Sequence, residues 1–365
     1  MIEYRCMKLL KEADLKNKKV LMRVGFDVVI DKLGNIIDDT RIKETIPSIK
    51  YILEQQPKLL TIISHLGRPD GKIVENLKLN NVANKLAELL NLKSEIKTSK
   101  SEIEIPQYKI TDNIYLLENI RFYPEEENND SEFAKKLASL GEVFIFEAFS
   151  AAHREHATTY KIFDFLPSYA GLEMEHEVSE LSKLLGDVER PYLLVIGGAK
   201  TEDKVPIIDR LKNKTDKILV GGRTSNLLHQ EKKYINDDKI QLTIDGIDQK
   251  KEVIKAEERP LDILDIGPET IKLFRAEIIK AKTILVAGPL GKIEENPFAN
   301  GTKEIYSQVS KSNSYKVACG GDTTEALNKF GLFDSFNFVS TGGGAALEFL
   351  AKGTLPSIEK LNKNK

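Results

Sequence analysis

Short apolar segments alternate with amphipathic segments through the N-terminal half of the chain. Helical patterns begin near Asp39-Thr40 and cover residues 79–92 and 131–141. The apolar segments between them predict strands at residues 19–24, 59–64, 114–122 and 142–149. This alternation is typical of βαβ units and a parallel sheet, in which ligands bind at the carboxyl ends of the strands.

In the C-terminal half, six short apolar segments each lead into glycine. They are YLLVIGGAK (192–200), KILVGGRTS (217–225), LDILDIGPET (261–270), KTILVAGPLG (282–291), KVACGGDTT (316–324) and NFVSTGGGAA (337–346). The segment 315–331 predicts a strand, a glycine turn and a helix closed by Gly331. Glycines allow close backbone approach to a ligand, and the N–H groups of a first helical turn attract anions. This pattern favours a nucleotide-binding edge.

Residues 171–191 separate the two halves and have the spacing of one long amphipathic helix. The pattern fits a helix joining two lobes and equally an ordinary surface helix. We expect an α/β protein of two lobes, each a mainly parallel sheet flanked by helices, with this segment as the hinge helix. The expected divisions are residues 1–170, a linker at 171–190, and residues 191–345.

Composition and charge narrow the function classes. A length of 365 residues suits about two domains, and 41% apolar with 30% charged residues is typical of soluble globular proteins. The net charge of −2, with no basic run among aromatics, argues against nucleic-acid binding. No signal-peptide core or membrane-length apolar stretch is present. Cys6 and Cys319 are too few for a disulfide framework and lack metal-ligand spacing. We expect a cytoplasmic monomer.

Cations follow the four predicted N-terminal strands. They are Arg23, His65, Arg68, Arg121, His153 and Arg154, with Arg41 on a connecting helix. One arginine after a strand is ordinarily a solvated surface residue, but this many cations at one edge would repel each other unless an anion bound among them. The arginine fork suits phosphate or carboxylate, at about 1.5–3 kcal/mol for each charge-assisted hydrogen bond. We therefore expect a small, highly anionic substrate.

Asp322 would repel phosphate at the start of the helix it opens. A Mg²⁺ ion between its carboxylate and the phosphates resolves this; alternatively Asp322 or Thr323 is simply an N-cap. Lys200 and Lys204 are candidates for contacting transferring phosphates, or plain surface lysines. Neither GxxxxGK[ST] nor a GxGxxG opening the first strand–helix unit is present. The combination favours phosphoryl transfer between a nucleotide and a small anion, which rests on positioning and charge stabilisation.

The chain resembles the phosphoglycerate kinase family over nearly its whole length. The segments that carry the resemblance, in the family's order, are DDTRI, SHLGRP, LLENIRFYPEEE, AFSAAHREHA, PSYAGLEME, GGAKTEDK, LDIGPET, GPLGKIE, GGDTTEAL, VSTGGGAALEFL and KGTLP. The resemblance implies a hinge-bending glycolytic enzyme that transfers the acyl phosphate of 1,3-bisphosphoglycerate to ADP, giving 3-phosphoglycerate and ATP with Mg²⁺. It also implies that residues 346–365 return to the N-terminal lobe.

The resemblance further implies roles for individual residues. The phosphoglycerate site would comprise Arg23, Gly25, Asp27, Arg41, His65, Leu66, Gly67, Arg68, Arg121, His153 and Arg154, with His156 nearby. The nucleotide site would comprise Gly198, Lys200, Lys204, Gly221, Gly222, Glu294, Gly320, Gly321, Asp322 and Thr323, with further N–H donors from Gly342–Gly344. Arg41, Lys200 and Lys204 would act on the transferring group, and Asp322 would hold the metal.

The chain departs from the family's pattern at five positions. Gly25 stands where an aspartate normally meets the substrate hydroxyl, and Asp27 stands where an asparagine is usual. The others are Phe146, Glu147 and Ala287. Losing one polar substrate contact costs about 1–3 kcal/mol. The alternatives are therefore a catalytically weak nucleotide- or anion-binding relative, or a kinase of another small carboxylate.

Overall fold

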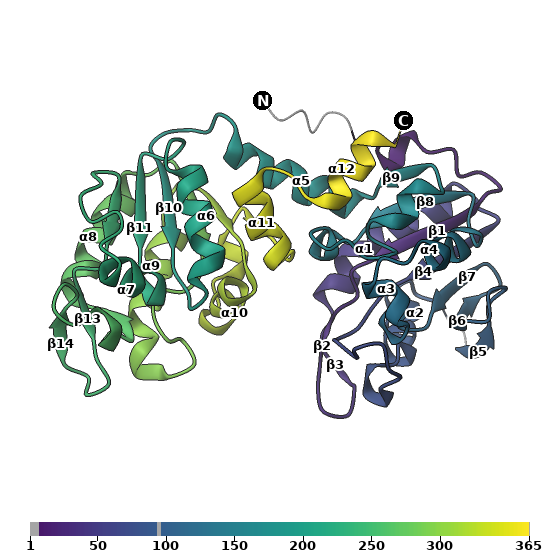
Figure 1. Ribbon diagram of the computed structural model, residues 1–365, viewed down its shortest axis with the longest axis horizontal. Coiled ribbons are helices and arrows are strands. Elements are labelled where there is room, and N and C mark those ends of the chain that lie inside the picture. The colour runs from purple at the N-terminus through teal and green to yellow at the C-terminus, as the bar shows by residue number, and fades with distance from the viewer. Residues whose placement is uncertain (1–6, 93–95, 365) are drawn as a thin grey trace. The chain divides into compact units, whose positions relative to one another are not determined.

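The chain divides into two compact units in a computed structural model that describes residues 7–92 and 96–364 (Figure 1). The N-terminal unit runs up to Ser179 and includes the C-terminal segment from Thr354. The C-terminal unit is Glu180–Gly353. The boundary falls inside helix α5 (Leu172–Leu185), so one continuous helix belongs to both units. Cys6 lies outside the described residues.

A seven-stranded sheet forms the centre of the N-terminal unit, in the order β5-β6-β7-β4-β1-β8-β9. The strands are β1 (Lys19–Val24), β4 (Leu59–Ile63), β5 (Lys97–Lys100), β6 (Pro106–Thr111), β7 (Ile114–Leu117), β8 (Val143–Glu147) and β9 (Ser168–Ala170). The pairs from β7 through β9 are parallel, whereas β6 is antiparallel to β5 and β7. The four predicted strands are β1, β4, β7 and β8; β5, β6 and β9 were not predicted.

The order in which strands are added to this sheet reverses between β1 and β8, although the two strands are parallel. From β1 the order runs through β4 to β7, while β8 and β9 lie on the other side of β1. At such a reversal the loops leaving adjacent strands diverge, which leaves room for a ligand at the carboxyl ends. The loops after Val24 and Glu147, which are register partners, therefore border the expected site.

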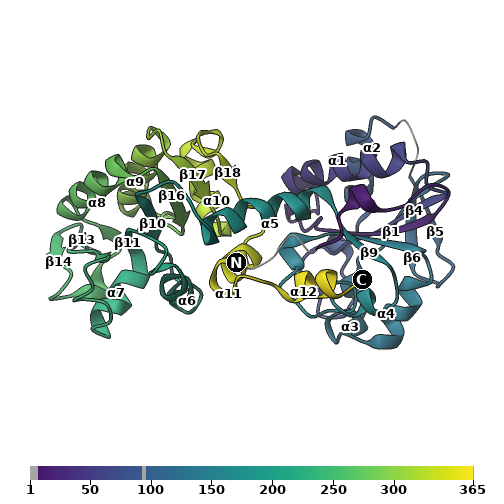
Figure 2. The same ribbon diagram turned by 90° about the horizontal axis from the view of Figure 1, so that it is seen from above.

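Helices cover both faces of this sheet (Figure 2). They are α1 (Thr40–Glu54) and α2 (Asn80–Leu89) on one face, and α3 (Pro124–Glu127), α4 (Ser131–Ala138) and α12 (Pro356–Lys363) on the other. Asp130 shows why a helix begins locally, since its Oδ1 accepts the Phe133 N–H at 2.7 Å and caps α4. A small hairpin of β2 (Val29–Ile30) and β3 (Ile36–Asp38) precedes α1.

The C-terminal unit contains a wholly parallel six-stranded sheet, in the order β12-β11-β10-β16-β17-β18. Its strands are β10 (Tyr192–Ile196), β11 (Lys217–Val220), β12 (Ile240–Leu242), β16 (Thr283–Ala287), β17 (Tyr315–Ala318) and β18 (Phe338–Val339). Five of the six predicted glycine-ended strands lie here. The sixth, β15 (Asp265–Ile266), was wrongly grouped with them: it pairs antiparallel with β13 (Asp245–Ile247) in a small sheet completed by β14 (Val253–Lys255).

Helices also flank this second sheet, α8, α9 and α10 on one face and α6, α7 and α11 on the other (Figure 2). Their bounds are α6 (Thr201–Leu211), α7 (Gly222–Gln230), α8 (Pro268–Lys280), α9 (Asn300–Ser310), α10 (Gly321–Phe330) and α11 (Gly344–Lys352). Helix α10 ends at Gly331 with a φ of 66°, the left-handed conformation that makes glycine the favoured terminator. Within the described residues, no helix is long and apolar enough to cross a membrane.

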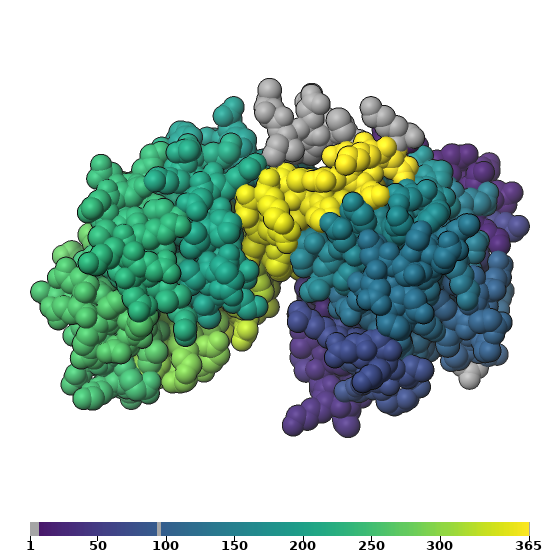
Figure 3. All heavy atoms as spheres, viewed as in Figure 1, coloured from purple at the N-terminus to yellow at the C-terminus, as the bar shows by residue number. Residues whose placement is uncertain are grey.

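The C-terminal segment is anchored on the N-terminal unit by specific contacts (Figure 3). The Ser357 backbone N–H donates to the Ala152 carbonyl at 3.2 Å, and its hydroxyl oxygen lies 3.0 Å from the same carbonyl oxygen. Leu355, Ile358 and Leu361 are buried. This anchoring holds the loop that follows β8.

Candidate active site

The predicted cations of the N-terminal unit lie at the carboxyl ends of four strands, in the loops after three of them and within the fourth strand itself. His65 and Arg68 follow β4, Arg121 follows β7, and Arg154 follows β8. Arg23 lies in β1 itself, one residue before its end. Because these strands are neighbours in the sheet, the fold brings together residues that are distant in sequence.

Arg23 is buried and holds His65 in a defined state. Its side chain is 1% exposed, and Nη2 lies 2.9 Å from Nδ1 of His65. A guanidinium has only donors, so Nδ1 accepts and Nε2 carries the imidazole proton. Burial, together with the charges of Arg23 and Arg121, holds the pKa of His65 well below its usual range. His65 is therefore a neutral donor, and Arg23 acts in this structure by orienting it.

The buried charge of Arg23 is balanced through Thr158. Arg23 Nε donates to Thr158 Oγ1 at 2.9 Å, and that hydroxyl donates to Glu126 Oε1 at 2.6 Å. The Thr158 backbone N–H donates to Glu126 Oε2 at 2.9 Å. Burial lowers the pKa of Arg23 to about 10, and the Glu126 carboxylate opposes that shift. Sequence reasoning missed Glu126 and Thr158; the signal was that an arginine in an apolar strand needs a buried counter-charge.

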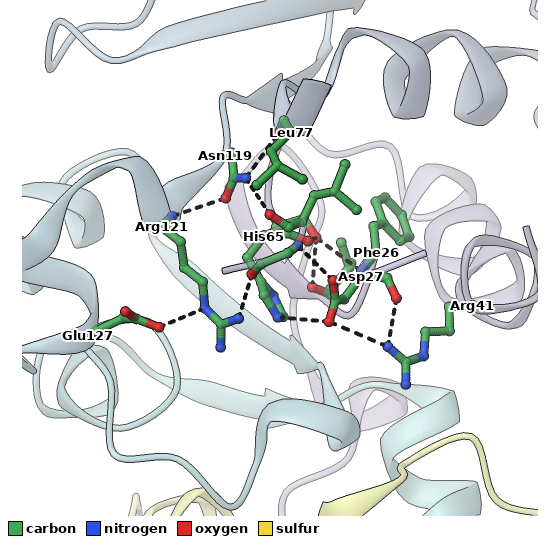
Figure 4. A network of polar contacts seen from close by, with 12 residues as sticks. Phe26, Asp27, Arg41, His65, Leu77, Asn119, Arg121 and Glu127 are labelled. Atoms are coloured by element: carbon green, nitrogen blue, oxygen red, sulfur yellow. Dashed lines mark hydrogen bonds and ion pairs between the residues drawn. The ribbon is translucent and has the colours of Figure 1, made fainter. Parts of the chain in front are cut away.

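Asp27 points into the loop that follows β4 (Figure 4). Its Oδ1 accepts the Gly67 N–H at 2.8 Å, while Oδ2 lies 3.7 Å from His65 Nε2 and 3.9 Å from Arg41 Nη1. The same Arg41 nitrogen donates to the Asp27 carbonyl oxygen at 2.7 Å. One carboxylate thus connects β1, the loop after β4 and the first turn of α1.

Arg121 and Asn119 fix the backbone of residues 66–67 (Figure 4). Arg121 Nη1 donates to the Gly67 carbonyl at 2.9 Å, and its Nε lies 3.3 Å from Glu127 Oε1. Asn119 Nδ2 donates to the Leu66 carbonyl at 2.8 Å. The Leu66 side chain is itself buried, so its place at the site is due to its backbone.

Two cations at this edge, Arg68 and Arg154, are not paired within the described part of the chain. Among the described residues, the side chains of Arg68 and Arg154 make no hydrogen bond or ion pair, and Arg68 is exposed. Burial and the nearby charges of Arg121, Arg154 and Arg23 lower the pKa of His156 to about 3, and His153 contributes to the same shift. Excess positive charge therefore surrounds this edge, which suits a ligand carrying several negative charges.

Several glycines of the C-terminal unit are needed by the fold itself. A Cβ on Gly197 would collide with the Pro289 carbonyl, and one on Gly288 with the Gly197 carbonyl. A Cβ on Gly222, whose φ is 60°, would lie 3.0 Å from the Gly198 nitrogen. The loops after β10, β11 and β16 therefore pack backbone against backbone, a reason for glycine that sequence reasoning assigned to the ligand alone.

Lys204 and Asp322 meet beside Gly198. The position of a Cβ on Gly198 would be 3.6 Å from Lys204 Cε and 4.0 Å from Asp322 Oδ2. Lys204 is buried, which lowers its pKa, while the Asp322 charge opposes the shift. Lys200 is exposed at the N-cap of α6, and Glu294 is exposed in the loop after Gly291.

Helix α10 begins at Gly321 and its N-cap is Gly320, so neither Asp322 nor Thr323 is the N-cap. Thr323 Oγ1 accepts the Gly288 N–H at 2.7 Å and donates to the Cys319 carbonyl at 2.7 Å, so this hydroxyl joins two loops. Open space surrounds the Cβ directions of Gly321, Gly343 and Gly344. The first N–H groups of α10 and α11 are helix-start donors of the kind that attract anions.

The donor set suits a cation that arrives with a ligand. Asp322 is an exposed carboxylate, and no group of three or more His, Cys, Asp or Glu in the described residues is arranged to hold a metal. Mg²⁺ is commonly bound by one or two carboxylates with phosphate oxygens completing its shell. Asp322 beside a phosphate-binding helix start fits that mode.

The sequence matches the phosphoglycerate kinase family over residues 10–260 and 236–353. It is 40% identical to a protein named phosphoglycerate kinase from Coprothermobacter proteolyticus, with 97% of this chain and 98% of that protein covered. A protein of the same name from Dictyoglomus turgidum is 41% identical, with 96% and 97% covered.

The fold agrees with these matches. The structure of phosphoglycerate kinase from Coxiella burnetii superposes with a TM-score of 0.83 at 31% identity, covering 98% of this chain and 99% of that one. The crystal structure of phosphoglycerate kinase from Pyrococcus horikoshii gives 0.80 at 27% identity, with the same coverage. The predicted family and fold class are thus confirmed, and the chain belongs to the phosphoglycerate kinase family of transferases.

Proposed function

We propose that this chain reversibly transfers the acyl phosphate of 1,3-bisphosphoglycerate to ADP, giving 3-phosphoglycerate and ATP. The observation that carries this proposal is the cationic charge at the strand ends of the N-terminal unit, where Arg68 and Arg154 make no ion pair with any described residue. A substrate with a phosphate and a carboxylate would supply the negative charge that balances these arginines. Family membership favours this enzyme over a non-catalytic binding module or a kinase of another carboxylate.

Each cation would act on a different part of the acceptor. Arg68 and Arg154 are the two that would pair with the distal phosphate, because neither is engaged by the protein. His65 Nε2–H would donate to the carboxylate, since Arg23 keeps its Nδ1 as an acceptor. Arg41, held by the Asp27 carbonyl, would stabilise charge on the transferring group. Arg23 and Arg121 would act chiefly by positioning these groups.

The nucleotide phosphates would lie along the C-terminal unit's helix starts. The N–H groups near Gly321 and Gly343–Gly344 would bind phosphate oxygens, and Lys200 and Lys204 would contact the transferring group. The family's use of ATP and ADP implies Mg²⁺, which would neutralise phosphate charge with Asp322 as its protein ligand. Glu294 and the loop at Gly221-Gly222 would contact the nucleoside. Transfer would be direct and in line after the units close on both ligands.

A coupled assay tests the proposal. With 3-phosphoglycerate and MgATP, ADP formation should depend on both substrates, and an Arg68→Ala/Arg154→Ala variant should lose most kcat/KM while still binding ATP. Turnover below one per minute in the unmodified protein, with intact nucleotide binding, would favour the weak-relative alternative. Turnover with another small carboxylate but not with 3-phosphoglycerate would show instead that the chain is a kinase of that carboxylate.

The assembly state and cellular location are further proposals. A monomer suits a chain that carries both sites on its own two units. A reducing, cytoplasmic setting suits the low cysteine content; Cys319, the free cysteine among the described residues, is buried. Sedimentation velocity and cell fractionation would test them.

A further inference from the structure

Ser150 presents an unused hydroxyl at the reversal point of the N-terminal sheet. It lies in the short 3₁₀ helix Phe149–Ala151 directly after β8, and its side chain is partly exposed. Within the part of the chain that the structure describes, this hydroxyl makes no hydrogen bond. Most polar side chains in a packed loop have a hydrogen-bond partner, but this hydroxyl is available to a partner from outside the protein.

The hydroxyl faces Gly25 across the loops that leave β1 and β8. A Cβ built on Gly25 would lie 3.0 Å from Ser150 Oγ and 3.8 Å from the Ala148 Cα. Gly25 does not have a positive φ, so its backbone does not require glycine. Because glycine has no Cβ, the space that a side chain at position 25 would fill is empty. Ser150 Oγ is the atom nearest to this space.

The loop that carries Ser150 is held in place. The Ala151 N–H donates to the Ala148 carbonyl at 2.9 Å, which closes the turn. The carbonyl of Ala152, two residues after Ser150, accepts the Ser357 backbone N–H at 3.2 Å, and the Ser357 hydroxyl lies between this carbonyl and that of Thr159. A hydroxyl on a fixed turn loses little further entropy when it binds.

The carboxylate of Asp27, the acidic group near this space, already has partners within the protein. Asp27 Oδ1 accepts the Gly67 N–H at 2.8 Å, and Oδ2 faces His65 and Arg41. The cations account for the anionic groups of a phosphorylated hydroxy acid but leave its hydroxyl without a partner. A neutral hydroxyl that can both donate and accept suits that group.

Resting on the proposed function, we propose that Ser150 binds the C2 hydroxyl of 3-phosphoglycerate, with Gly25 leaving the space in which the two hydroxyls meet. The role that the resemblance gives to an aspartate at position 25 is thus met from the 3₁₀ turn that follows the neighbouring strand β8. Side chains at 25 and 150 are alternatives, since a Cβ at 25 would lie against the serine oxygen.

Calorimetry with two ligands tests this without turnover. Ser150→Ala should weaken 3-phosphoglycerate binding about fivefold, the usual worth of one neutral hydrogen bond, and leave the Kd of 3-phosphonooxypropanoate, which lacks the hydroxyl, unchanged. Ser139→Ala is the matched control: Ser139 is exposed at the end of α4 that leads into the opposite edge of the sheet, and its hydroxyl bonds the Lys136 carbonyl. Equal effects of Ser150→Ala on both ligands, or no effect, would overturn the inference.

A double-mutant cycle tests the exchange between the two positions. Gly25→Asp alone should weaken 3-phosphoglycerate binding, because its Cβ crowds Ser150; Gly25→Asp/Ser150→Gly should recover most of that loss. The same effect of Gly25→Asp in both backgrounds would refute it. Melting temperatures within a few degrees of the parent show that the variants fold. If the unmodified protein bound neither ligand, the proposed function would fail before this inference was reached.

Discussion

Nη2 of Arg23 donates to Nδ1 of His65 across 2.9 Å, joining β1 to the loop after β4. The contact fixes the tautomer of the imidazole and places a permanent positive charge beside it. The proton on Nε2 therefore points towards Asp27 Oδ2, 3.7 Å away, at the edge proposed to bind substrate (Figure 4). The pair makes His65 a fixed neutral donor whose behaviour with pH can be measured.

We expect His65 to remain neutral when the solution becomes mildly acidic. Burial and Arg23 depress its folded pKa, so its contribution to stability is complete above the unfolded value of about 6.5 and is lost as pH falls towards the folded pKa. The Cε1–H resonance of His65, assigned by its absence in His65→Gln, should not shift between pH 8 and 5. A titration midpoint near 6.5 would contradict this. The same variant should be less sensitive to acid unfolding.

Asp27 should have two opposite effects. Its negative charge should weaken the binding of an anionic substrate, and its Oδ1 should stabilise the loop after β4 by accepting the Gly67 N–H. Asp27→Asn keeps an acceptor for the Gly67 N–H and removes one negative charge beside an anionic ligand. At about 1 kcal/mol for charges roughly 4 Å apart in water, KM for 3-phosphoglycerate should fall about fivefold, and less at high salt. Asp27→Ala leaves the N–H unpaired and should raise KM instead. A higher KM in Asp27→Asn would show that the carboxylate itself contacts substrate.

Glu147 makes the start of α5 sensitive to pH. Its Oε1 accepts hydrogen bonds from the Ser48 hydroxyl and, at 3.2 Å, from the Glu173 N–H; Oε2 accepts the Met174 N–H at 3.3 Å. Burial raises the pKa of Glu147 to about 7 from 4.5, although these contacts oppose it. Because the folded pKa is raised, the stabilisation is complete below pH 4.5 and is lost as pH rises through about 7.

The Glu147→Gln variant measures this dependence. A pKa raised from 4.5 to about 7, at ~1.4 kcal/mol per pH unit, predicts that the parent loses about 3.5 kcal/mol of stability from this group across that range. Urea midpoints followed by circular dichroism should fall between pH 4.5 and 7.5 in the parent and change less in Glu147→Gln. Parallel pH profiles would show that Glu147 does not titrate there.

Asp322 should affect the metal-dependent step and spare acceptor binding. Asp322→Asn keeps the size of the side chain beside Lys204 but removes the charge proposed to hold Mg²⁺. We expect kcat to fall by at least a hundredfold and the Mg²⁺ requirement to rise, with the Kd of 3-phosphoglycerate unchanged. Asp334→Asn, an exposed carboxylate of the same unit, is the control. An unchanged kcat would remove Asp322 from the mechanism.

The sequence by itself determined the alternation of elements, the family and the strand ends that carry cations or glycines. These are local or motif properties: Gly331 terminates α10 because its own backbone is left-handed, and Asp130 caps α4 three residues ahead. The same local reasoning wrongly grouped β15 with the main sheet and did not find β5 and β6. An apolar run before a glycine does not specify its pairing partner, and the exposed residues 97–100 carry no apolar face to signal a strand.

The contacts and burial of each candidate site residue were decided only by the tertiary structure. The sequence predicted Arg23 as a cation that binds the substrate, but in the structure it is buried, and Thr158 and Glu126, more than a hundred residues later, supply its partners. Ser150 gains its place beside Gly25 because β1 and β8 are neighbours in the sheet. The physical reason is that burial, pKa shifts and hydrogen-bond partners depend on which strands pair, and pairing is settled by the whole hydrophobic core rather than by the residues at the strand ends.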